Sequence, residues 1–271
     1  TKPKKIRRVK GVMYTLLDVT KKYKLNKILK NNYDYVVNLS GVTSNLYSKD
    51  NQKNIYNSHV LGSKNLMKFF LSKNIKKFVQ IGSSAEYGNA NSPQRENLNC
   101  KPVNTYGRAK LKATKYLQSI YKSHKFNGTV LRLFQVYGPG QGNEKAAVQI
   151  LLNCYKNKIF PASDGKQIRD FCYIDDVTEA IFKSFDNKKI IGKILNIGYG
   201  RGIVFRHFIL SIRNLVRGGH PQFGLFKSRS HENPKLVPDI KKAKKLLNWK
   251  PKTKLMLGLK KTLDYLKVYE K

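Results

Sequence analysis

Residues 76–88 read KKFVQIGSSAEYG, and the rest of the chain is organised around them. A short apolar run from Phe78 to Ile81 lies between lysines and a Gly-Ser-Ser turn, a pattern typical of a buried parallel strand. The turn carries two hydroxyl groups, those of Ser83 and Ser84. We therefore expect a strand whose carboxyl end presents these hydroxyls.

A second motif follows about one helix-length later, where residues 103–117 read VNTYGRAKLKATKYL. Asn104 or Thr105 can cap a helix that begins here. Tyr106 and Lys110 are four positions apart and would share one face of that helix. A serine at a strand end and a Tyr/Lys pair on a helix can then converge on one point.

This combination suits alcohol/ketone redox with a nicotinamide cofactor. A phenol with its ordinary pKa of about 10 is a poor base at neutral pH. We expect the Lys110 ammonium to favour the phenolate of Tyr106, and Ser83 to hold the oxygen whose proton is transferred. The spacing of the pair is not specific by itself, because a chain with 16 tyrosines and 54 lysines and arginines contains such pairs by chance.

The order of the motifs is more specific than the pair. The segments GSSAEYG at 82–88, TYGRAK at 105–110 and VLRLFQVYGPG at 130–140 resemble the extended short-chain dehydrogenase/reductases, the NAD-dependent epimerase/dehydratase family that acts on nucleotide sugars. The resemblance covers essentially all 271 residues. It implies an α/β fold, a Rossmann-like doubly wound parallel sheet that is N-terminally truncated, with a small C-terminal substrate lobe.

The resemblance also implies a division of the chain. Residues 1–143 with parts of 165–200 would form the truncated dinucleotide-binding domain, and residues 144–164 and 201–271 the substrate-binding lobe. Residues 9–20, VKGVMYTLLDVT, resemble the third strand of the nucleotide-binding fold. A helix from Lys24 to Lys30, a strand near 33–43, a helix from Asn51 to Leu71 and a strand over 128–141 should follow.

The site residues come from the matching motif positions. Ser83 would be the catalytic hydroxyl, Tyr106 the acid/base, and Lys110 the partner of the tyrosine and of the nicotinamide ribose. The residues expected at the cofactor are Asp18, Val19, Leu39, Ser40, Gly41, Tyr106, Lys110 and Phe134, and those expected at the substrate are Ser84, Gln135, Arg169, Arg229 and Glu232.

Three positions keep alternatives open. Asp18 can equally cap the next helix, and Arg169 can equally form a surface ion pair with Asp170. His59 stands three residues before Gly62, where the family usually has Asn, and this departure weakens any catalytic role for His59.

The cofactor should be NAD or NADP, although the phosphate-binding loop is absent from this chain. Enzymes of this fold begin with a strand, a Gly-rich turn and a helix whose N-terminus binds the pyrophosphate. The sequence contains no such unit, which takes about 30 residues. Two explanations are open: a fragment of a longer chain, favoured by the start without Met, or a degenerate member that holds the dinucleotide weakly.

The function expected from the resemblance is chemistry at the sugar C4, by a 4-ketoreductase or a 4-epimerase. The tail, GGHPQFG followed by SRSHENPKLVPDI, looks more like the ketoreductases, whereas the central motifs fit an epimerase equally well. A 4,6-dehydratase is not expected, because Ser84 and Ala85 replace the Asp-Glu pair of those relatives. The rival hypothesis is a cofactor-deficient, non-catalytic nucleotide-sugar-binding homologue.

Composition bounds the partners. The net charge of +38 comes from lysines scattered along every segment, without a nucleic-acid-binding motif, so a biased composition is favoured over RNA binding. The three cysteines are too few and too spread for a disulfide framework or a metal site, and no apolar run reaches the length of a membrane span. The few cysteines predict a cytoplasmic protein. The resemblance implies a nucleotide-diphosphate sugar as the partner, and we expect a homodimer.

Overall fold

The fold is that of a computed structural model, which describes residues 8–29, 33–42, 49–226 and 233–269. Four parallel strands form its central sheet, in the order β1, β2, β3, β7. They are β1 (Tyr35–Asn38), β2 (Lys77–Ser83), β3 (Gly128–Leu133) and β7 (Ile194–Ile197). The helices that cover this sheet are α3 (Gly62–Leu71), α4 (Thr105–His124), α6 (Ile174–Ser184) and α8 (Lys241–Leu247).

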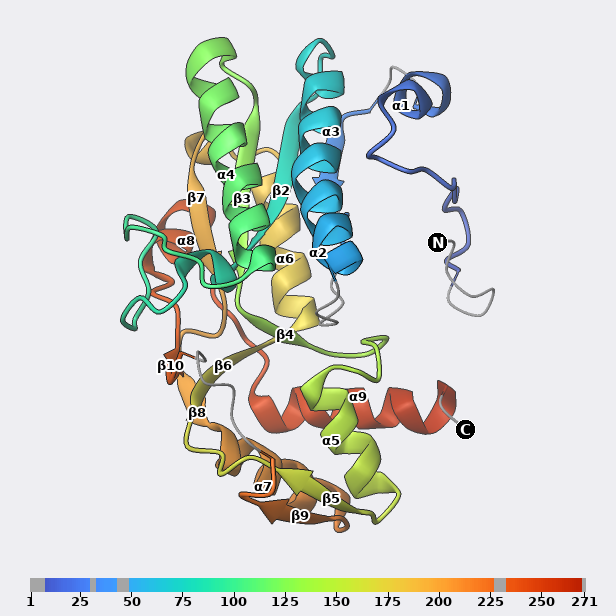
Figure 1. The fold of residues 1–271 in the computed structure, drawn as a ribbon, viewed down its shortest axis with the longest axis vertical. Helices are drawn as coiled ribbons and strands as arrows, with labels where there is room; N and C mark the ends of the chain where they lie inside the picture. The colour runs from blue at the N-terminus through green and yellow to red at the C-terminus, as the bar shows by residue number, and fades with distance from the viewer. Residues whose placement is uncertain (1–7, 30–32, 43–48, 227–232, 270–271) are drawn as a thin grey trace.

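Alternate residues of each central strand face opposite helical layers. Phe78 packs in a cluster with residues of α3 and α4, and its ring centroid lies 6.2 Å from that of Phe70. Val79, the next residue, packs with Val177 of α6 on the other face. Figure 1 shows α3 and α4 in front of the sheet and α6 behind it. A strand buried on both faces explains the continuous apolar run in β2, and the predicted doubly wound parallel sheet is confirmed.

A second group of elements lies below the sheet in Figure 1. In one small sheet β6 pairs in parallel with β4 and β10 and antiparallel with β8. A separate two-stranded sheet is formed by β5 and β9, which are parallel. A separate apolar core joins three helices to these strands. The strands are β4 (Gln135–Tyr137), β5 (Ile159–Ala162), β6 (Ile168–Tyr173), β8 (Gly202–Val204), β9 (His220–Phe223) and β10 (Lys235–Leu236), and the helices are α5 (Ala146–Tyr155), α7 (Phe205–Val216) and α9 (Leu255–Tyr269).

The strand predicted over 128–141 is two strands in two sheets. The Phe134 amide still donates to the carbonyl oxygen of Ile197 in the central sheet, at 3.0 Å. After this residue the chain leaves the central sheet, and β4 pairs with β6 instead. A single apolar run therefore links the two halves of the molecule.

The strand predicted over residues 9–20 is absent, and that prediction was wrong. Residues 8–20 contain turns and irregular backbone. Met13 is 80% exposed and Leu16 is 64% exposed. A strand persists only when its backbone pairs with a neighbour. No strand in the described part of the chain lies against this segment.

The remaining elements are helical. The expected helix after residue 20 is α1 (Lys22–Ile28), two residues earlier than predicted. The expected helix over 51–71 is a continuous run of α2 (Lys49–Tyr56), the π-helical turn η2 (Asn57–Leu61) and α3. Two short 3₁₀ turns are η3 (Ser84–Tyr87) and η4 (Lys188–Ile190). Among the described residues, no helix combines the length and the apolar character that a membrane crossing needs.

Candidate active site

Ser83 is the last residue of β2 and also the N-cap of η3. Its Oγ accepts a hydrogen bond from the Ala85 amide at 3.2 Å. A serine at this position satisfies an amide that the short helix leaves without an intrahelical partner. The strand thus ends in a tight turn that presents Ser83 and Ser84 to one cavity.

The start of α4 packs directly on this turn. Asn104 is the N-cap of α4, and its Oδ1 accepts from the Gly107 amide at 2.8 Å. A Cβ added at Gly107 would lie 2.4 Å from the carbonyl oxygen of Ala85, so only glycine allows the close approach of α4 to η3. The approach places Tyr106, on the first turn of α4, next to Ser83.

The phenol of Tyr106 is protonated at neutral pH in this structure. Burial raises the pKa of Tyr106, a hydrogen bond with Ser83 opposes the rise, and the charge of Glu86 adds to it. Burial outweighs the opposing influence, so the pKa of Tyr106 lies above its ordinary value, and the net lowering expected from Lys110 is not seen. Tyr106 is therefore set as a proton donor.

Lys110 lies beneath the tyrosine and is only 5% exposed. Its Nζ donates to the carbonyl oxygen of Ile81 at 2.9 Å and lies 5.8 Å from the centroid of the Tyr106 ring. Burial lowers the pKa of Lys110 to about 8, although the charge of Glu86 acts in the opposite direction. A buried ammonium thus stands one helical turn from the phenol.

His59 forms the wall behind Tyr106. The two rings meet edge to face with centroids 5.1 Å apart. The Nε2 atom of His59 lies 3.0 Å from the carbonyl oxygen of Val42, and a Cβ at Gly41 would overlap the imidazole ring. Burial and the nearby Lys110 charge lower the pKa of His59 to about 4. A neutral imidazole therefore packs at the π-helical turn η2, a kind of turn often found at functional sites.

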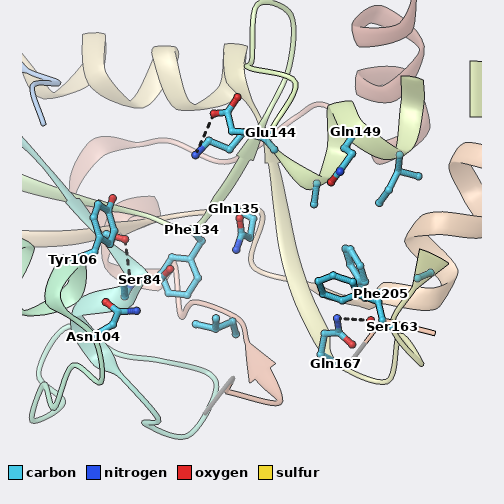
Figure 2. Close-up of a pocket in the computed structure, with 18 of the residues that line it drawn as sticks. Ser84, Asn104, Tyr106, Phe134, Gln135, Glu144, Gln149, Ser163, Gln167 and Phe205 are labelled. Atoms are coloured by element: carbon cyan, nitrogen blue, oxygen red, sulfur yellow. Dashed lines mark hydrogen bonds and ion pairs between the residues drawn. The ribbon is translucent and has the colours of Figure 1, made fainter. Parts of the chain in front are cut away.

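The cavity in front of Ser83 and Tyr106 has a volume of about 910 Å³. In Figure 2, Ser84, Asn104 and Tyr106 lie at one end, and Gln149, Ser163, Gln167 and Phe205 lie at the other. Phe134 and Gln135 stand between these groups, at the point where the chain passes from the central sheet to the smaller one. The cavity therefore spans both groups of elements, as a two-part ligand would require.

The residues predicted at the adenosine end of a cofactor lie near β1 and α3. Asp18 Oδ1 accepts from the amide and the hydroxyl of Thr20, at 2.9 and 2.7 Å, and these bonds lower the Asp18 pKa. Asp18 is not the cap of α1, whose N-cap is Lys21. Asn65 of α3 holds the carbonyl oxygen of Val19 at 3.1 Å. These contacts fix the backbone of the 18–20 turn against α3.

The end of β1 carries the other predicted cofactor residues. The Ser40 amide and hydroxyl both donate to Asn38 Oδ1, at 3.0 and 2.6 Å. Leu39 is 69% exposed and Gly41 has a φ of +133°, a backbone conformation that favours glycine. The structure therefore leaves an open apolar side chain, Leu39, beside a rigid polar turn.

Three predicted substrate residues lie away from the cavity or outside the described part. Arg169 is only 4% exposed and does not line the cavity. Its Nη1 donates to the carbonyl oxygens of Ile168 and Pro234, at 2.8 and 3.4 Å. Arg169 and Asp170 do not form a surface ion pair with each other: Asp170 is 0% exposed and accepts from the amides of residues 199–201. Arg229 and Glu232 lie outside the described residues.

Sequence reasoning missed the role of Glu86. Its carboxylate accepts from the Ser83 amide at 2.9 Å, which completes a capping box at η3. The spacing of a serine followed by a glutamate three residues later is the known signature of that box and could have identified this residue.

The sequence is similar to one protein family and to many individual proteins of known or assigned activity. The model of the NAD dependent epimerase/dehydratase family matches residues 2–198, more than half of the chain. A UDP-glucuronate 4-epimerase of Thermodesulfobacterium geofontis is 29% identical over 78% of the chain and 65% of its own length. An uncharacterized UDP-glucose epimerase of Bacillus subtilis is 29% identical over 86% of the chain and 74% of its own length. The chain thus spans about two thirds to three quarters of these relatives.

Solved structures give the same grouping. A UDP-glucose 4-epimerase of Thermotoga maritima, solved with UDP-glucose, superimposes with a TM-score of 0.92 at 23% identity, over 99% of this chain and 88% of that one. A UDP-glucuronic acid 4-epimerase of Bacillus cereus, solved with UDP-glucuronic acid and NAD, superimposes with a TM-score of 0.82 at 27% identity, over 93% and 79%. The first likeness shows the fold alone.

Proposed function

The chain belongs to the NAD dependent epimerase/dehydratase family, and from that premise we propose that it acts at C4 of a nucleotide-diphosphate sugar, as a 4-epimerase or a 4-ketoreductase. The observation that carries this proposal is the meeting of Ser83 and Tyr106 at the wall of one cavity, with the Lys110 ammonium beneath them. The names of the relatives, UDP-glucuronate 4-epimerase and UDP-glucose epimerase, favour epimerisation over net reduction.

Each residue has a stated task in this proposal. The Tyr106 hydroxyl gives a proton to the oxygen on C4 when a ketone is reduced, and the Tyr106 phenolate takes one from that oxygen when an alcohol is oxidised. Ser83 Oγ hydrogen-bonds the same oxygen and orients it. Lys110 supplies positive charge below the ring, which stabilises the phenolate that remains after the proton has left. A nicotinamide dinucleotide, when bound, accepts or supplies the hydride.

The residues fit the nicotinamide end of such a cofactor. Phe134 is apolar and lines the cavity next to the Ser84 and Gln135 positions, while Tyr106 and Lys110 offer a hydroxyl and an ammonium to a ribose. We propose Asp18, Val19 and the turn at 39–41 for the adenosine end. The sequence contains no unit of strand, Gly-rich turn and helix of the kind that binds a pyrophosphate.

We propose that the nucleotide part of the substrate occupies the far end of the cavity. Binding sites for small ligands have volumes of roughly 300–1,000 Å³, so a cavity of about 910 Å³ is of the right size. The side chains of Gln149, Ser163 and Gln167 are neutral hydrogen-bonding groups, and Phe205 offers an aromatic surface. We keep Ser84 and Gln135 as sugar contacts and Arg169, Arg229 and Glu232 as contacts of the rest of the substrate. A dimeric state and a cytoplasmic location stay predictions.

The test is a product assay with UDP-, TDP- and GDP-hexoses and the matching 4-keto sugars. An epimerase forms the C4 epimer without net consumption of cofactor, whereas a reductase oxidises NADH or NADPH in proportion to product. We expect no 4-keto-6-deoxy product, because Glu144 is the only carboxylate among the described residues that line the cavity, and Lys145 pairs with it at 3.6 Å. Nucleotide-sugar binding without turnover would support the non-catalytic homologue instead.

A further inference from the structure

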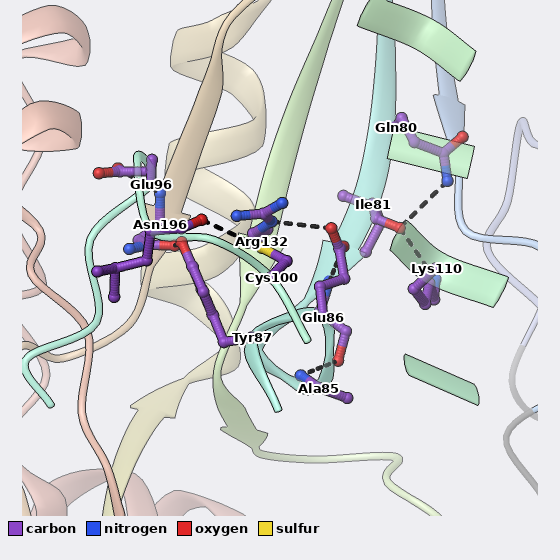
Figure 3. Close-up of polar contacts among 12 residues, drawn as sticks. Gln80, Ile81, Ala85, Glu86, Tyr87, Glu96, Cys100, Lys110, Arg132 and Asn196 are labelled. Atoms are coloured by element: carbon purple, nitrogen blue, oxygen red, sulfur yellow. Dashed lines mark hydrogen bonds and ion pairs between the residues drawn. The ribbon is translucent and has the colours of Figure 1, made fainter. Parts of the chain in front are cut away.

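A buried anion stands directly behind the catalytic turn. Glu86 is 0% exposed, and its Oε1 accepts from the Ser83 amide at 2.9 Å. The Ser83 hydroxyl in turn accepts from the Ala85 amide. The Glu86 carboxylate thus holds the backbone amide of Ser83, and the Ala85 amide holds the Ser83 hydroxyl. Figure 3 shows Glu86 between Ala85 and Arg132.

Arg132 of β3 neutralises this anion. Its Nε donates to Glu86 Oε2 at 2.8 Å, and its side chain is 2% exposed. The register of the sheet sets Arg132 opposite Gly82 of β2. A Cβ at Gly82 would lie 2.6 Å from Glu86 Oε1 and 3.0 Å from Arg132 Cγ. The missing side chain at Gly82 therefore makes room for the ion pair immediately before Ser83.

The Arg132 guanidinium also packs on an aromatic ring. Its central carbon lies 4.6 Å from the centroid of the Tyr87 ring, and the Tyr87 hydroxyl donates to Asn196 Oδ1 of β7 at 2.7 Å. In Figure 3, Glu86 lies on one side of Arg132, and Tyr87 and Asn196 lie on the other. The pair is therefore braced by three adjacent strands of the central sheet and cannot shift without disturbing them.

Stability alone does not account for such a pair. Taking two charges out of water costs about as much as their attraction returns, and apolar replacements of similar volume are often neutral or stabilising. Arg132 Nη1 is moreover buried without a hydrogen-bond partner in the described part of the chain. A role that depends on direction and charge is a better explanation than a gain in folding energy.

We propose that the Glu86–Arg132 ion pair is a positioning device that fixes the Ser83 backbone, and thereby aims the Ser83 hydroxyl at the oxygen that Tyr106 protonates. The inference rests on the proposed function of Ser83. Glu86 and Arg132 do not line the cavity, so they act through Ser83 and not on the substrate. A charged acceptor forms a stronger hydrogen bond to the amide than a neutral one, and it can be braced by Arg132 in a way that an amide cannot.

The experiment is a double-mutant cycle in the full protein. E86L and R132M are introduced together, so that no unpaired charge remains buried. We expect turnover to fall tenfold or more, with less than a threefold change in the dissociation constant of the nucleotide sugar. In an S83A background the same pair of changes should lower turnover less than twofold further, because the group they position is already gone. The neutral acceptor in E86Q, combined with R132M, should recover part of the loss.

The matched control removes a partly exposed ion pair between α6 and Lys252, neither of whose residues lines the cavity. Lys252 Nζ lies 3.0 Å from Glu179 Oε1, and E179Q with K252M should leave turnover unchanged. Hydrogen exchange at the Ser83 amide gives a readout that does not depend on activity. Its protection should fall in E86L/R132M and stay in the control, and thermal unfolding shows that each variant folds.

The outcomes separate this inference from the proposed function. If S83A lowers turnover but E86L/R132M does not, or if their losses multiply, the positioning role is overturned and the function of Ser83 stands. If S83A has no effect, the proposed function of Ser83 fails. In that case the hydrogen exchange of the Ser83 amide decides. Lower protection in E86L/R132M supports positioning of the Ser83 backbone by the ion pair, and unchanged protection overturns that role.

Discussion

Tyr106 shows how a single residue is prepared by its surroundings. Burial keeps its proton on at neutral pH, and the hydrogen bond with Ser83 opposes that effect. Lys110 is close but bonded to the Ile81 carbonyl oxygen, so its ammonium is held below the ring and does not bind the phenol. Tyr106 therefore rests in its acid form. It becomes a base only after it has lost its proton, and the nearby Lys110 ammonium would stabilise the phenolate that forms.

Replacing Tyr106 by Phe removes the proton and keeps the ring. General acid–base groups contribute about 10²–10⁴ in rate, so Y106F should lower turnover a hundredfold or more. The dissociation constant of the nucleotide sugar should change little, because the ring still packs against His59. Steady-state kinetics with calorimetry measures both quantities. Y56F, on α2, is the control, and turnover retained in Y106F would move the acid to another residue.

His59 should make stability depend on pH. Its pKa is about 4 in the folded protein and about 6.5 when unfolded, so between these values the unfolded chain binds a proton that the folded chain does not. Stability is therefore lost as pH falls through this window, by about 2 kcal/mol between pH 7.5 and 5. H59Q should lose this part of the dependence. Urea unfolding at several pH values measures it, with H124Q at an exposed site as control. Parallel curves for the two variants would contradict the assignment.

At the scale of elements, Arg169 ties β6 to the segment before β10. Its Nη1 bonds to the carbonyl oxygens of Ile168 and Pro234 bridge these two segments. If Arg169 also contacts the substrate diphosphate, R169A should raise the Michaelis constant more than it lowers turnover, because such a contact exists in both ground and transition states. Kinetics and thermal unfolding are measured together, with R213A on α7 as control. A lower melting temperature with an unchanged Michaelis constant would restrict Arg169 to a structural role.

Local patterns were sufficient to predict some elements and not others. The apolar run closed by small residues predicts β2, and Asn104 as an N-cap predicts the start of α4. Both predictions succeed because these features depend on residues that are neighbours in the sequence. The break at Phe134 depends on a bond to Ile197, which is distant in the sequence. The run VMYTLL at residues 12–17 is apolar enough for a strand, yet the segment has no strand to pair with in the described part of the chain.

The same limit applies to the candidate site. The motifs predicted that Ser83 and Tyr106 would meet, and the structure brings them together. The carbonyl partner of Lys110 and the packing of His59 on Tyr106 depend on the tertiary fold, and no spacing in the sequence announces them. The buried partners of Arg169 likewise belong to segments that are far apart in the chain.

At the scale of the whole molecule, the central sheet has one open side. Among the described strands, β1 pairs only with β2. Val9, Met13 and Leu16 are each more than half exposed in the segment before α1. Parallel strands are normally covered and paired on both sides, so the 271 residues alone should tend to associate through this region.

The affinities of these 271 residues for the dinucleotide and for the nucleotide sugar should differ widely. The 271 residues as given should bind NAD or NADP weakly and still recognise a nucleotide sugar. Contacts from Asp18, Val19, Tyr106 and Lys110 are available, but the sequence contains no unit of strand, Gly-rich turn and helix of the kind that binds a pyrophosphate. Hydrogen bonds to charged groups contribute roughly 1.5–3 kcal/mol each, so two or three fewer lower the affinity by several powers of ten.

Calorimetric titration of these 271 residues with NAD, NADP and a panel of nucleotide sugars tests the prediction. The cavity that we assign to the sugar nucleotide is formed by residues of these 271, so its ligand should bind with a dissociation constant in the range typical of Michaelis constants, about 1 μM to 1 mM. K110M should weaken the remaining dinucleotide binding and leave nucleotide-sugar binding unchanged, because Lys110 lies outside the cavity lining. Tight binding of the dinucleotide would mean that another group holds the pyrophosphate, and the scattered lysines of this strongly basic chain would be the first to examine by salt titration.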